Sequence, residues 1–390
     1  MQNRVDALLS LRGVACLMVV FIHCSPPREF LLCQGYDFSW ILFAPGGVAV
    51  WIFFTLSGYL MGKGFYTERY KTDKQGIFNF WQNRALRILP LYIFVIVVLS
   101  VFAYPDALRP KNWEQYARLF TFTYRLLNSD LIDIDAPLWS LSTEVQFYLM
   151  VPFIYVFTHP FLKKLSDILL FAVAIISAVF GLKLWVSYQH EIRTNLILAV
   201  KYWYTPLATN VDIFICGFLI NPLLKSIRYK VPLRQQKLMK IASVVLLVIF
   251  YCTSAYYFYH TNLGVSVNFT KTTVFLFQPL TALLTSFFVF AFELQLDKHG
   301  KNQKLLPTSI KNNPIRALEV IGNLSFGIYV WHLPIILRLS PLYTSAALWK
   351  MYCFRLVIAL TFSTALAITT YYLIEVPFAK YKAYKTNLTN

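Results

Sequence analysis

Two ionisable residues stand on one face of the first apolar stretch. Arg12 and His23 lie eleven positions apart within the stretch 5–24. At about 100° and 1.5 Å per residue, a helix places them about 20° apart around its axis and about 16 Å apart along it. Ionisable groups are costly in a bilayer and usually face a functional interior. Since imidazole can act as a general base and guanidinium can bind oxygen atoms, the pair predicts a catalytic residue beside a polar track. The alternative for His23 is a helix-bridging role.

A carboxylate lies near the start of a later apolar stretch. Glu144 falls in segment 137–148, which also contains several hydroxyl-bearing side chains. If the two helices run antiparallel, Glu144 and His23 reach a similar depth. A carboxylate can orient an imidazole and stabilise its protonated form, which a general base requires. The alternatives are that Glu144 pairs with another buried cation, or is protonated and bridges helices.

Two arginines precede the third apolar stretch. Arg84 and Arg87 are three positions apart, so they share one helical face at the membrane surface. Each guanidinium offers a fork of donors that suits phosphate recognition. The alternative is that both are topological charges in contact with lipid headgroups.

Three further segments are more polar than contact with lipid requires. Ser57 and Gly58 end the second apolar stretch and permit close helix approach or backbone exposure to a ligand. Segment 322–332 contains Tyr329 and His332, for which ordinary helix packing is the alternative. Glu375, followed by a proline at 377, predicts a helix stop with one placed carboxylate.

The elements that must position these residues are membrane-spanning helices. Of the 390 residues, 57% are hydrophobic and 14% are charged, which is outside the usage of soluble domains. A hydrocarbon core of about 30 Å needs about 20 residues per helix. Ten stretches qualify: 5–24, 41–61, 89–103, 138–157, 168–186, 207–224, 238–259, 273–292, 318–337 and 349–374. We predict an all-α membrane protein, a bundle of about ten transmembrane helices that forms one domain over residues 1–390.

The charges predict the orientation of this bundle. The net charge is +18, and most Lys and Arg residues fall in segments that share one side with the N-terminus. The positive-inside rule then places both termini in the cytosol, and it explains the basic residues without a nucleic-acid partner. The six cysteines are scattered without a paired motif, so we assign no disulfide and no metal site.

Together these segments resemble the membrane acyltransferase-3 family across the chain. Five family patterns occur in order, and their residues are Arg12 with His23, Phe53 to Gly58, Arg84 with Arg87, Trp139 to Glu144, and Ser325 to His332. Phe326 stands where the family commonly has Tyr, and Gly327 follows it. The resemblance implies an O-acyltransferase of sugars and related acceptors in the bacterial inner membrane.

The resemblance also implies roles. The expected co-substrate is acyl-CoA, with acetyl-CoA as the expected donor, and the acceptor is a carbohydrate or glycolipid such as lipopolysaccharide or exopolysaccharide. His23, oriented by Glu144, removes the acceptor proton, while Arg12 stabilises the acyl carbonyl or the cofactor arm. The expected cofactor-binding residues are Arg84, Arg87 and Ser57, and the expected substrate-binding residues are Trp139, Ser142, Tyr329 and His332. An acyl-His23 intermediate and the oligomeric state stay open.

Two functions from other classes compete with this interpretation. A secondary transporter of a carbohydrate or lipid-linked sugar also uses intramembrane Arg, His and Glu, but the sequence lacks the repeat symmetry that such folds show. A non-catalytic scaffold would have no use for Arg12 and His23 on one face. Among enzymes, the other membrane O-acyltransferase superfamily lacks this pair in its first helix.

Overall fold

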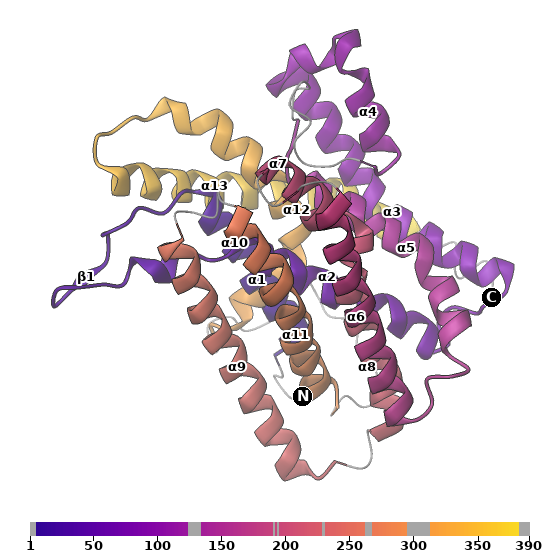
Figure 1. Ribbon diagram of the computed structural model, residues 1–390. Coiled ribbons are helices and arrows are strands. Elements are labelled where there is room, and N and C mark those ends of the chain that lie inside the picture. The colour runs from indigo at the N-terminus through magenta and orange to yellow at the C-terminus, as the bar shows by residue number, and fades with distance from the viewer. Residues whose placement is uncertain are drawn as a thin grey trace.

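The chain is almost entirely helical (Figure 1). The structure is a computed structural model that describes residues 5–123, 134–189, 192, 195–227, 231–261, 267–294 and 313–381. Within these ranges the strands are β1 (Leu32–Cys33) and β2 (Tyr36–Asp37), which pair as a short antiparallel hairpin. The predicted all-α class is confirmed.

Eight helical spans among the described residues are long and apolar enough to cross a membrane. They contain α2 (Gly46–Tyr66), α3 (Lys74–Val98), α5 (Leu138–Thr158), α6 (Leu165–Gln189), α9 (Leu233–His260), α11 (Gln278–Glu293), α12 (Arg316–Leu339) and α13 (Leu348–Thr370). Two helices of 17 residues accompany them, α1 (Ala7–His23) and α8 (Val211–Ile227). Each of the ten predicted stretches overlaps one of these helices. The cytosolic location of both termini stays a prediction, and residues 1–4 and 382–390 lie outside the described ranges.

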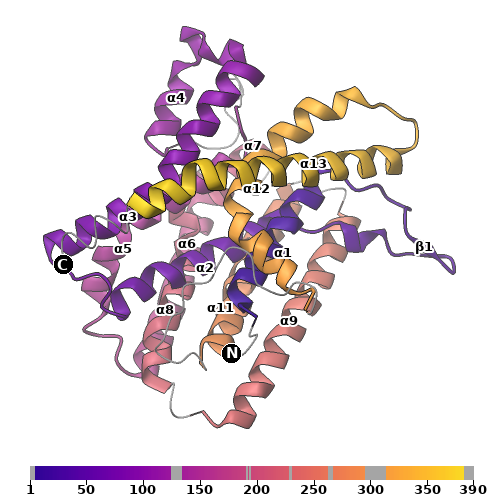
Figure 2. The same ribbon diagram turned by 180° about the vertical axis from the view of Figure 1, so that it is seen from behind.

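Short helices connect the long ones. They are α4 (Trp113–Phe120), α7 (Leu196–Ala199) and α10 (Val267–Thr272). Figure 1 shows α6, α8, α9 and α11 with roughly aligned axes, and α4 at one end of the molecule. Seen from behind, α13 lies across the bundle next to α12, and its end approaches α3 (Figure 2).

The boundary predicted for the third stretch, 89–103, is wrong. Helix α3 begins at Lys74, where the side chain of Asp73 caps it by accepting from the Gly76 N–H at 2.7 Å. Pro90 lies inside the helix, because the loss of one N–H and a local adjustment are tolerated where neighbouring helices support the backbone. A π-helical turn, η2 (Leu99–Ala103), extends the helix. The arginines at 84 and 87 therefore lie within α3 rather than ahead of it.

Glycines on facing helices bring the backbones into direct contact. A Cβ atom on Gly13 of α1 would lie 2.2 Å from the carbonyl oxygen of Leu318 in α12. In return, a Cβ atom on Gly322 of α12 would lie 2.0 Å from the carbonyl oxygen of Leu9 in α1. Small residues allow such close approach, and van der Waals packing drives helix association in a membrane. The pair α1–α12 is thereby held in one register.

Helices α2 and α8 use the same device. A Cβ atom on Gly58 would lie 1.9 Å from the carbonyl oxygen of Phe214, and one on Gly217 would lie 1.9 Å from that of Thr55. Of the two roles expected at position 58, close helix approach is therefore present. The contact positions Ser57, which precedes Gly58, inside the bundle, where it is 6% exposed.

A change of Gly322 to alanine is expected to destabilise the protein. The added methyl group collides with a backbone carbonyl that cannot move aside, and overpacking of this kind typically costs about 1–3 kcal/mol. The control is Gly181→Ala in α6, since a Cβ atom there has no neighbour within 4 Å. Thermal unfolding of both variants in detergent should show a lower midpoint for Gly322→Ala alone. Equal midpoints would contradict the close packing of α1 and α12.

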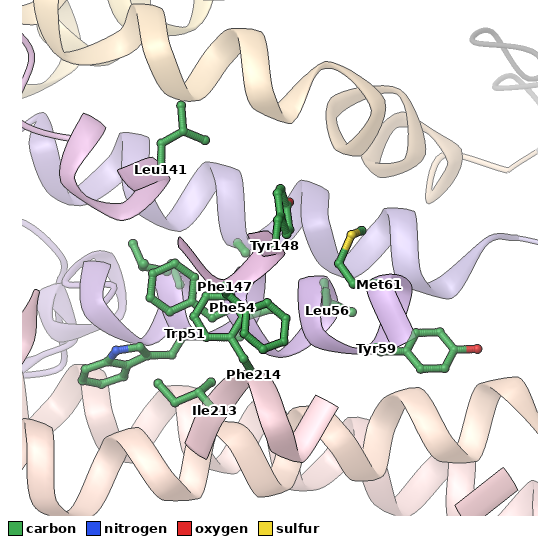
Figure 3. Close-up of a cluster of buried hydrophobic side chains, with 14 of the residues drawn as sticks. Trp51, Phe54, Leu56, Tyr59, Met61, Leu141, Phe147, Tyr148, Ile213 and Phe214 are labelled. Carbon is green, nitrogen blue, oxygen red and sulfur yellow. The ribbon is translucent and has the colours of Figure 1, made fainter. Parts of the chain in front are cut away.

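An aromatic core joins α2, α5 and α8. The ring of Phe214 stacks on Phe54 at 4.5 Å and on Phe147 at 4.3 Å between centroids, with Trp51 beside them (Figure 3). All four side chains are buried. Aromatic pairs of this kind stabilise a core beyond what their buried area contributes. The core therefore fixes which faces of these three helices turn inward. Ser57 and Glu144 lie on the helices so aligned.

Candidate active site

His23 and His332 lie against each other. His23 is the last residue of α1, and His332 is fully buried in α12. Nε2 of His332 lies 3.1 Å from Nδ1 of His23, and the ring centroids are 5.0 Å apart. Nδ1 of His332 lies 2.6 Å from the carbonyl oxygen of Tyr329. Two imidazoles and a backbone carbonyl therefore form one hydrogen-bonded chain.

The carbonyl end of this chain determines where the protons lie. A carbonyl oxygen only accepts, so Nδ1 of His332 must donate to Tyr329. Neutral His332 then has a lone pair at Nε2, and Nδ1 of His23 donates to it. Nε2 of His23 is left with a lone pair. A base whose tautomer is held by a second group is the arrangement used to activate nucleophiles.

Tyr329 ties this chain to the start of α5. Its hydroxyl lies 2.7 Å from Oγ of Ser140 and donates to the carbonyl oxygen of Pro137 at 3.2 Å. Its ring meets the edge of Phe53 from α2, with centroids 6.4 Å apart. Three helices therefore hold the residue whose carbonyl orients His332.

Arg12 lies on the same helix as His23 and has donors to spare. One guanidinium N–H donates to Oγ of Ser325 at 3.3 Å, and the group lies over the ring of Phe53 at 5.9 Å. Its Nε is buried and has no hydrogen-bond partner among the described residues. Within the same ranges Arg12 forms no ion pair. Buried polar groups are normally satisfied, so the guanidinium of Arg12 has a hydrogen-bonding donor that the described residues leave unused.

Glu144 is the centre of a separate cluster. Its Oε1 accepts short hydrogen bonds from the hydroxyls of Ser57 and Tyr148, and these two hydroxyls lie 3.0 Å apart. Glu144 also interacts electrostatically with Arg12. The cluster joins α2 to α5 near the middle of both helices.

The expected orientation of His23 by Glu144 is wrong for the described residues. Their hydrogen bonds pair His23 with His332, and Glu144 with Ser57 and Tyr148. The reason lies in the order of the helices, since α12 rather than α5 packs along α1. Glu144 instead accepts from Ser57 and Tyr148, and it interacts electrostatically with Arg12 without an ion pair among the described residues.

The two arginines of α3 have different surroundings. Arg87 forms an ion pair with Glu375, whose side chain is 4% exposed while that of Arg87 is 41% exposed. Glu375 belongs to a π-helical turn, η11 (Tyr371–Glu375), at the end of α13. Nε of Arg84 is buried and has no partner among the described residues. One guanidinium is thus held by a carboxylate, whereas the other keeps free donors.

Trp139 and Ser142 lie inside the helix bundle. Trp139 is buried against the rings of Phe54 and Tyr204, with centroids 6.2 Å and 5.1 Å away. Ser142 is 1% exposed, and its hydroxyl has no hydrogen-bond partner among the described residues. Trp139 therefore packs the core, and Ser142 offers one unsatisfied hydroxyl.

Sequence reasoning assigned no site role to three residues that complete these contacts. Tyr148 and Ser325 lie in motifs that were noted, but a hydroxyl within an apolar helix gives no signal of its own. Glu375 was expected to mark a helix stop, yet it is buried and paired with Arg87. Its signal was available, because a carboxylate at the end of an apolar span is costly unless it is paired.

Comparison with known proteins identifies a family over nearly the whole chain. Residues 5–372 match the model of a family described as an acyltransferase domain, acyltransferase 3. No solved structure matches this chain.

Several curated proteins are similar at low identity. The peptidoglycan O-acetyltransferase OatA of Listeria monocytogenes is 25% identical over 395 residues, covering 97% of this chain and 56% of the relative. The O-acetyltransferase OatA of Staphylococcus aureus (strain NCTC 8325) is 26% identical over 351 residues, covering 86% of this chain and 53% of the relative. The acyltransferase MdmB of Streptomyces mycarofaciens is 28% identical over 158 residues, covering 39% of each. The chain thus spans about half the length of the OatA proteins that it matches.

Proposed function

The chain belongs to the acyltransferase-3 family, and from that premise we propose that it is a membrane enzyme that moves an acetyl group from acetyl-CoA to a carbohydrate hydroxyl. The observation that carries the proposal is the hydrogen bond between His23 and His332, which fixes a tautomer with a lone pair on Nε2 of His23. A base of this kind serves proton abstraction from a hydroxyl. The expected acceptor is an envelope glycan, which agrees with the names of the OatA relatives.

In the proposed reaction His23 moves one proton twice. Its Nε2 takes the proton of the acceptor hydroxyl as that oxygen attacks the thioester carbonyl carbon. The new C–O bond forms, the C–S bond breaks, and the leaving CoA sulfur receives the proton from His23. A second arrangement, in which His23 itself carries the acetyl group before the acceptor arrives, uses the same lone pair.

Arg12 suits the cofactor arm better than the reacting carbonyl. It lies eleven residues from His23, which corresponds to about 16 Å along the helix, so it cannot reach an oxygen held at His23. Its unsatisfied Nε and its weak contact with Ser325 leave donors for the amide oxygens of a thioester arm that threads along α1. Of the two expected roles of Arg12, we retain the second.

Arg84 and Arg87 are assigned to the phosphates of the cofactor. A half-buried Arg84 with an unpartnered Nε, and a partly exposed Arg87, suit an anion that stays in water while its arm enters the bundle. Ser57 donates a hydrogen bond to Glu144, and Glu144 interacts electrostatically with Arg12. In this way Ser57 contributes to the proposed path of the cofactor arm. Tyr329 and His332 act as positioning residues for His23. Trp139 packs beside the site, and the unpaired hydroxyl of Ser142 is a candidate contact for the acceptor.

The proposed activity is tested with membranes that contain the chain and radiolabelled acetyl-CoA. Label should enter the glycan fraction and leave it as acetate on mild alkaline treatment, because O-acetyl esters are alkali-labile. Matched membranes without the chain are the control. If the chain is instead a transporter of a sugar or lipid-linked sugar, proteoliposomes will accumulate that solute and no ester will form.

Loss of the arginines in α3 is expected to weaken donor binding selectively. Hydrogen bonds to charged groups contribute about 1.5–3 kcal/mol each, so Arg84→Ala should raise KM for acetyl-CoA by about 10- to 100-fold. Because Arg87→Ala alone would leave a buried carboxylate unpaired, it is combined with Glu375→Gln. The control is Arg69→Ala with Lys71→Ala, which removes exposed charges between α2 and α3. An equal loss of affinity for donor and acceptor, or no loss of affinity for either, would indicate that both arginines have only a topological role.

A further inference from the structure

A small basic pocket lies where α2, α5 and α8 end. It has a volume of about 260 Å³ and is lined by Tyr66, His159, Leu162, Lys163, Pro222, Lys225 and Ser226. No carboxylate is among the lining residues. The lysines at its mouth are exposed, whereas the hydroxyl of Tyr66 is buried. The lining of the pocket therefore combines two exposed positive charges with one buried hydroxyl donor.

Among the described residues, three donors of this pocket have no partner, whereas the Ser226 hydroxyl donates to the carbonyl oxygen of Leu223 at 2.9 Å. The Tyr66 hydroxyl has no hydrogen bond within the described ranges. For the ammonium groups of Lys163 and Lys225, the described part of the chain provides no ion pair. The ring of His159 is held between aromatic neighbours, stacked on Tyr155 at 4.8 Å and edge-on to Tyr66 at 5.7 Å. Burial and the charges of Lys225 and Lys163 lower the pKa of His159, which favours its neutral form.

The pocket is remote from the candidate active site. Ser57 and Tyr66 lie nine residues apart on α2, which is about 13 Å along the helix. Glu144 and His159 lie fifteen residues apart, about 22 Å by the same measure. His23 is linked through His332 and Tyr329 to the opposite end of α5, at Pro137. A ligand in this pocket therefore does not touch the reacting groups.

We propose that this pocket binds the phosphate of an anionic ester at the membrane surface. Two ammonium groups, a phenol and an imidazole N–H match the acceptor oxygens of one phosphate. The volume is below the range of about 300–1,000 Å³ that encloses a whole small molecule, so only the phosphate end and its first carbons fit. Basic pockets between helix ends are a known means of holding lipid headgroups, and the apolar wall of Leu162 and Pro222 suits the start of a lipid tail.

The test measures binding to the full chain in neutral detergent, without turnover, so its outcome is independent of the proposed acetyl transfer. One arm compares the binding of phosphatidylglycerol with that of phosphatidylcholine. The other arm compares the binding of CoA with that of dephospho-CoA. The double variant Lys163→Ala with Lys225→Ala, which loses two basic side chains, should bind phosphatidylglycerol about 30-fold more weakly. The charge-matched control, Lys164→Ala with Lys237→Ala, removes two exposed lysines outside the pocket and should bind as the parent does.

Tyr66→Phe provides a second variant, since it removes one oxygen and keeps the ring packing. This variant should weaken binding of the same ligand, although the net charge of the protein is unchanged. If the CoA arm alone responds to these changes, the phosphate belongs to the cofactor and the site stands. If neither ligand responds, or if both lysine pairs behave alike, the proposal is overturned, and the lysines only offset the carbonyl ends of three helices.

Discussion

A His23→Ala protein is expected to lose acyl transfer by about 10²- to 10⁴-fold, the range that general-base assistance contributes. His23 supplies the only lone pair at the free end of the imidazole chain described above, and the neighbouring His332 cannot replace it because both of its ring nitrogens are engaged. His23 ends its helix and is only partly buried, so truncation should cost far less in stability than in activity. The measurement is transfer from labelled acetyl-CoA in membranes with matched amounts of protein.

His260→Ala is the matched control for this change. His260 also ends a membrane helix, α9, but it is exposed, and among the described residues its ring contacts those of Tyr256 and Tyr259. It should retain full transfer. Near-normal transfer by His23→Ala, with the protein present in the membrane, would remove the mechanism.

The two arrangements proposed for His23 differ in one measurable product. With labelled donor and no acceptor, an acetyl-imidazole would leave label on the protein after a rapid quench, and His23→Ala would abolish it. Direct transfer leaves the protein unlabelled. Either result is compatible with a base at position 23, so this experiment distinguishes the order of steps rather than the identity of the residue.

A His332→Phe protein is expected to lose about 100-fold or more in kcat, with little change in KM for either substrate. Phenylalanine fills the space of the ring but accepts no hydrogen bond, so Nδ1 of His23 loses the acceptor that fixes its tautomer. Loss of the orienting group in a catalytic triad can cost about 10⁴-fold through the wrong tautomer. Steady-state kinetics with acetyl-CoA and acceptor varied in turn measures both constants.

Rescue separates positioning from packing. In His332→Gln the side-chain amide oxygen can accept from Nδ1 of His23, so this variant should recover a substantial part of kcat. A residue that only fills space would give the reverse order, with phenylalanine better than glutamine in the buried site. Equal activity of the two variants would show that the contact with His23 does not matter.

Two local properties of the sequence determined much of this protein. Mean apolar content over about 20 residues predicted the ten helices, since crossing a hydrocarbon core is a requirement on each segment separately. Helical periodicity placed Arg12 and His23 on one face, because backbone hydrogen bonding sets the rotation per residue without reference to other segments. The boundary of α3 was missed, because charged residues and Pro90 hid a helix whose first half lies outside the apolar window.

Only the tertiary structure decided which side chains meet. His23 and His332 are separated by 309 positions, and they touch because Gly13 and Gly322 allow the backbones of α1 and α12 to approach. Glu144 meets Ser57 rather than His23 because the aromatic core of α2, α5 and α8 turns it toward α2. Hydropathy and periodicity describe one helix at a time. The order and rotation of helices depend on packing between surfaces far apart in the chain, where lipid and protein are equally apolar and only close fit and hydrogen bonds distinguish one partner from another.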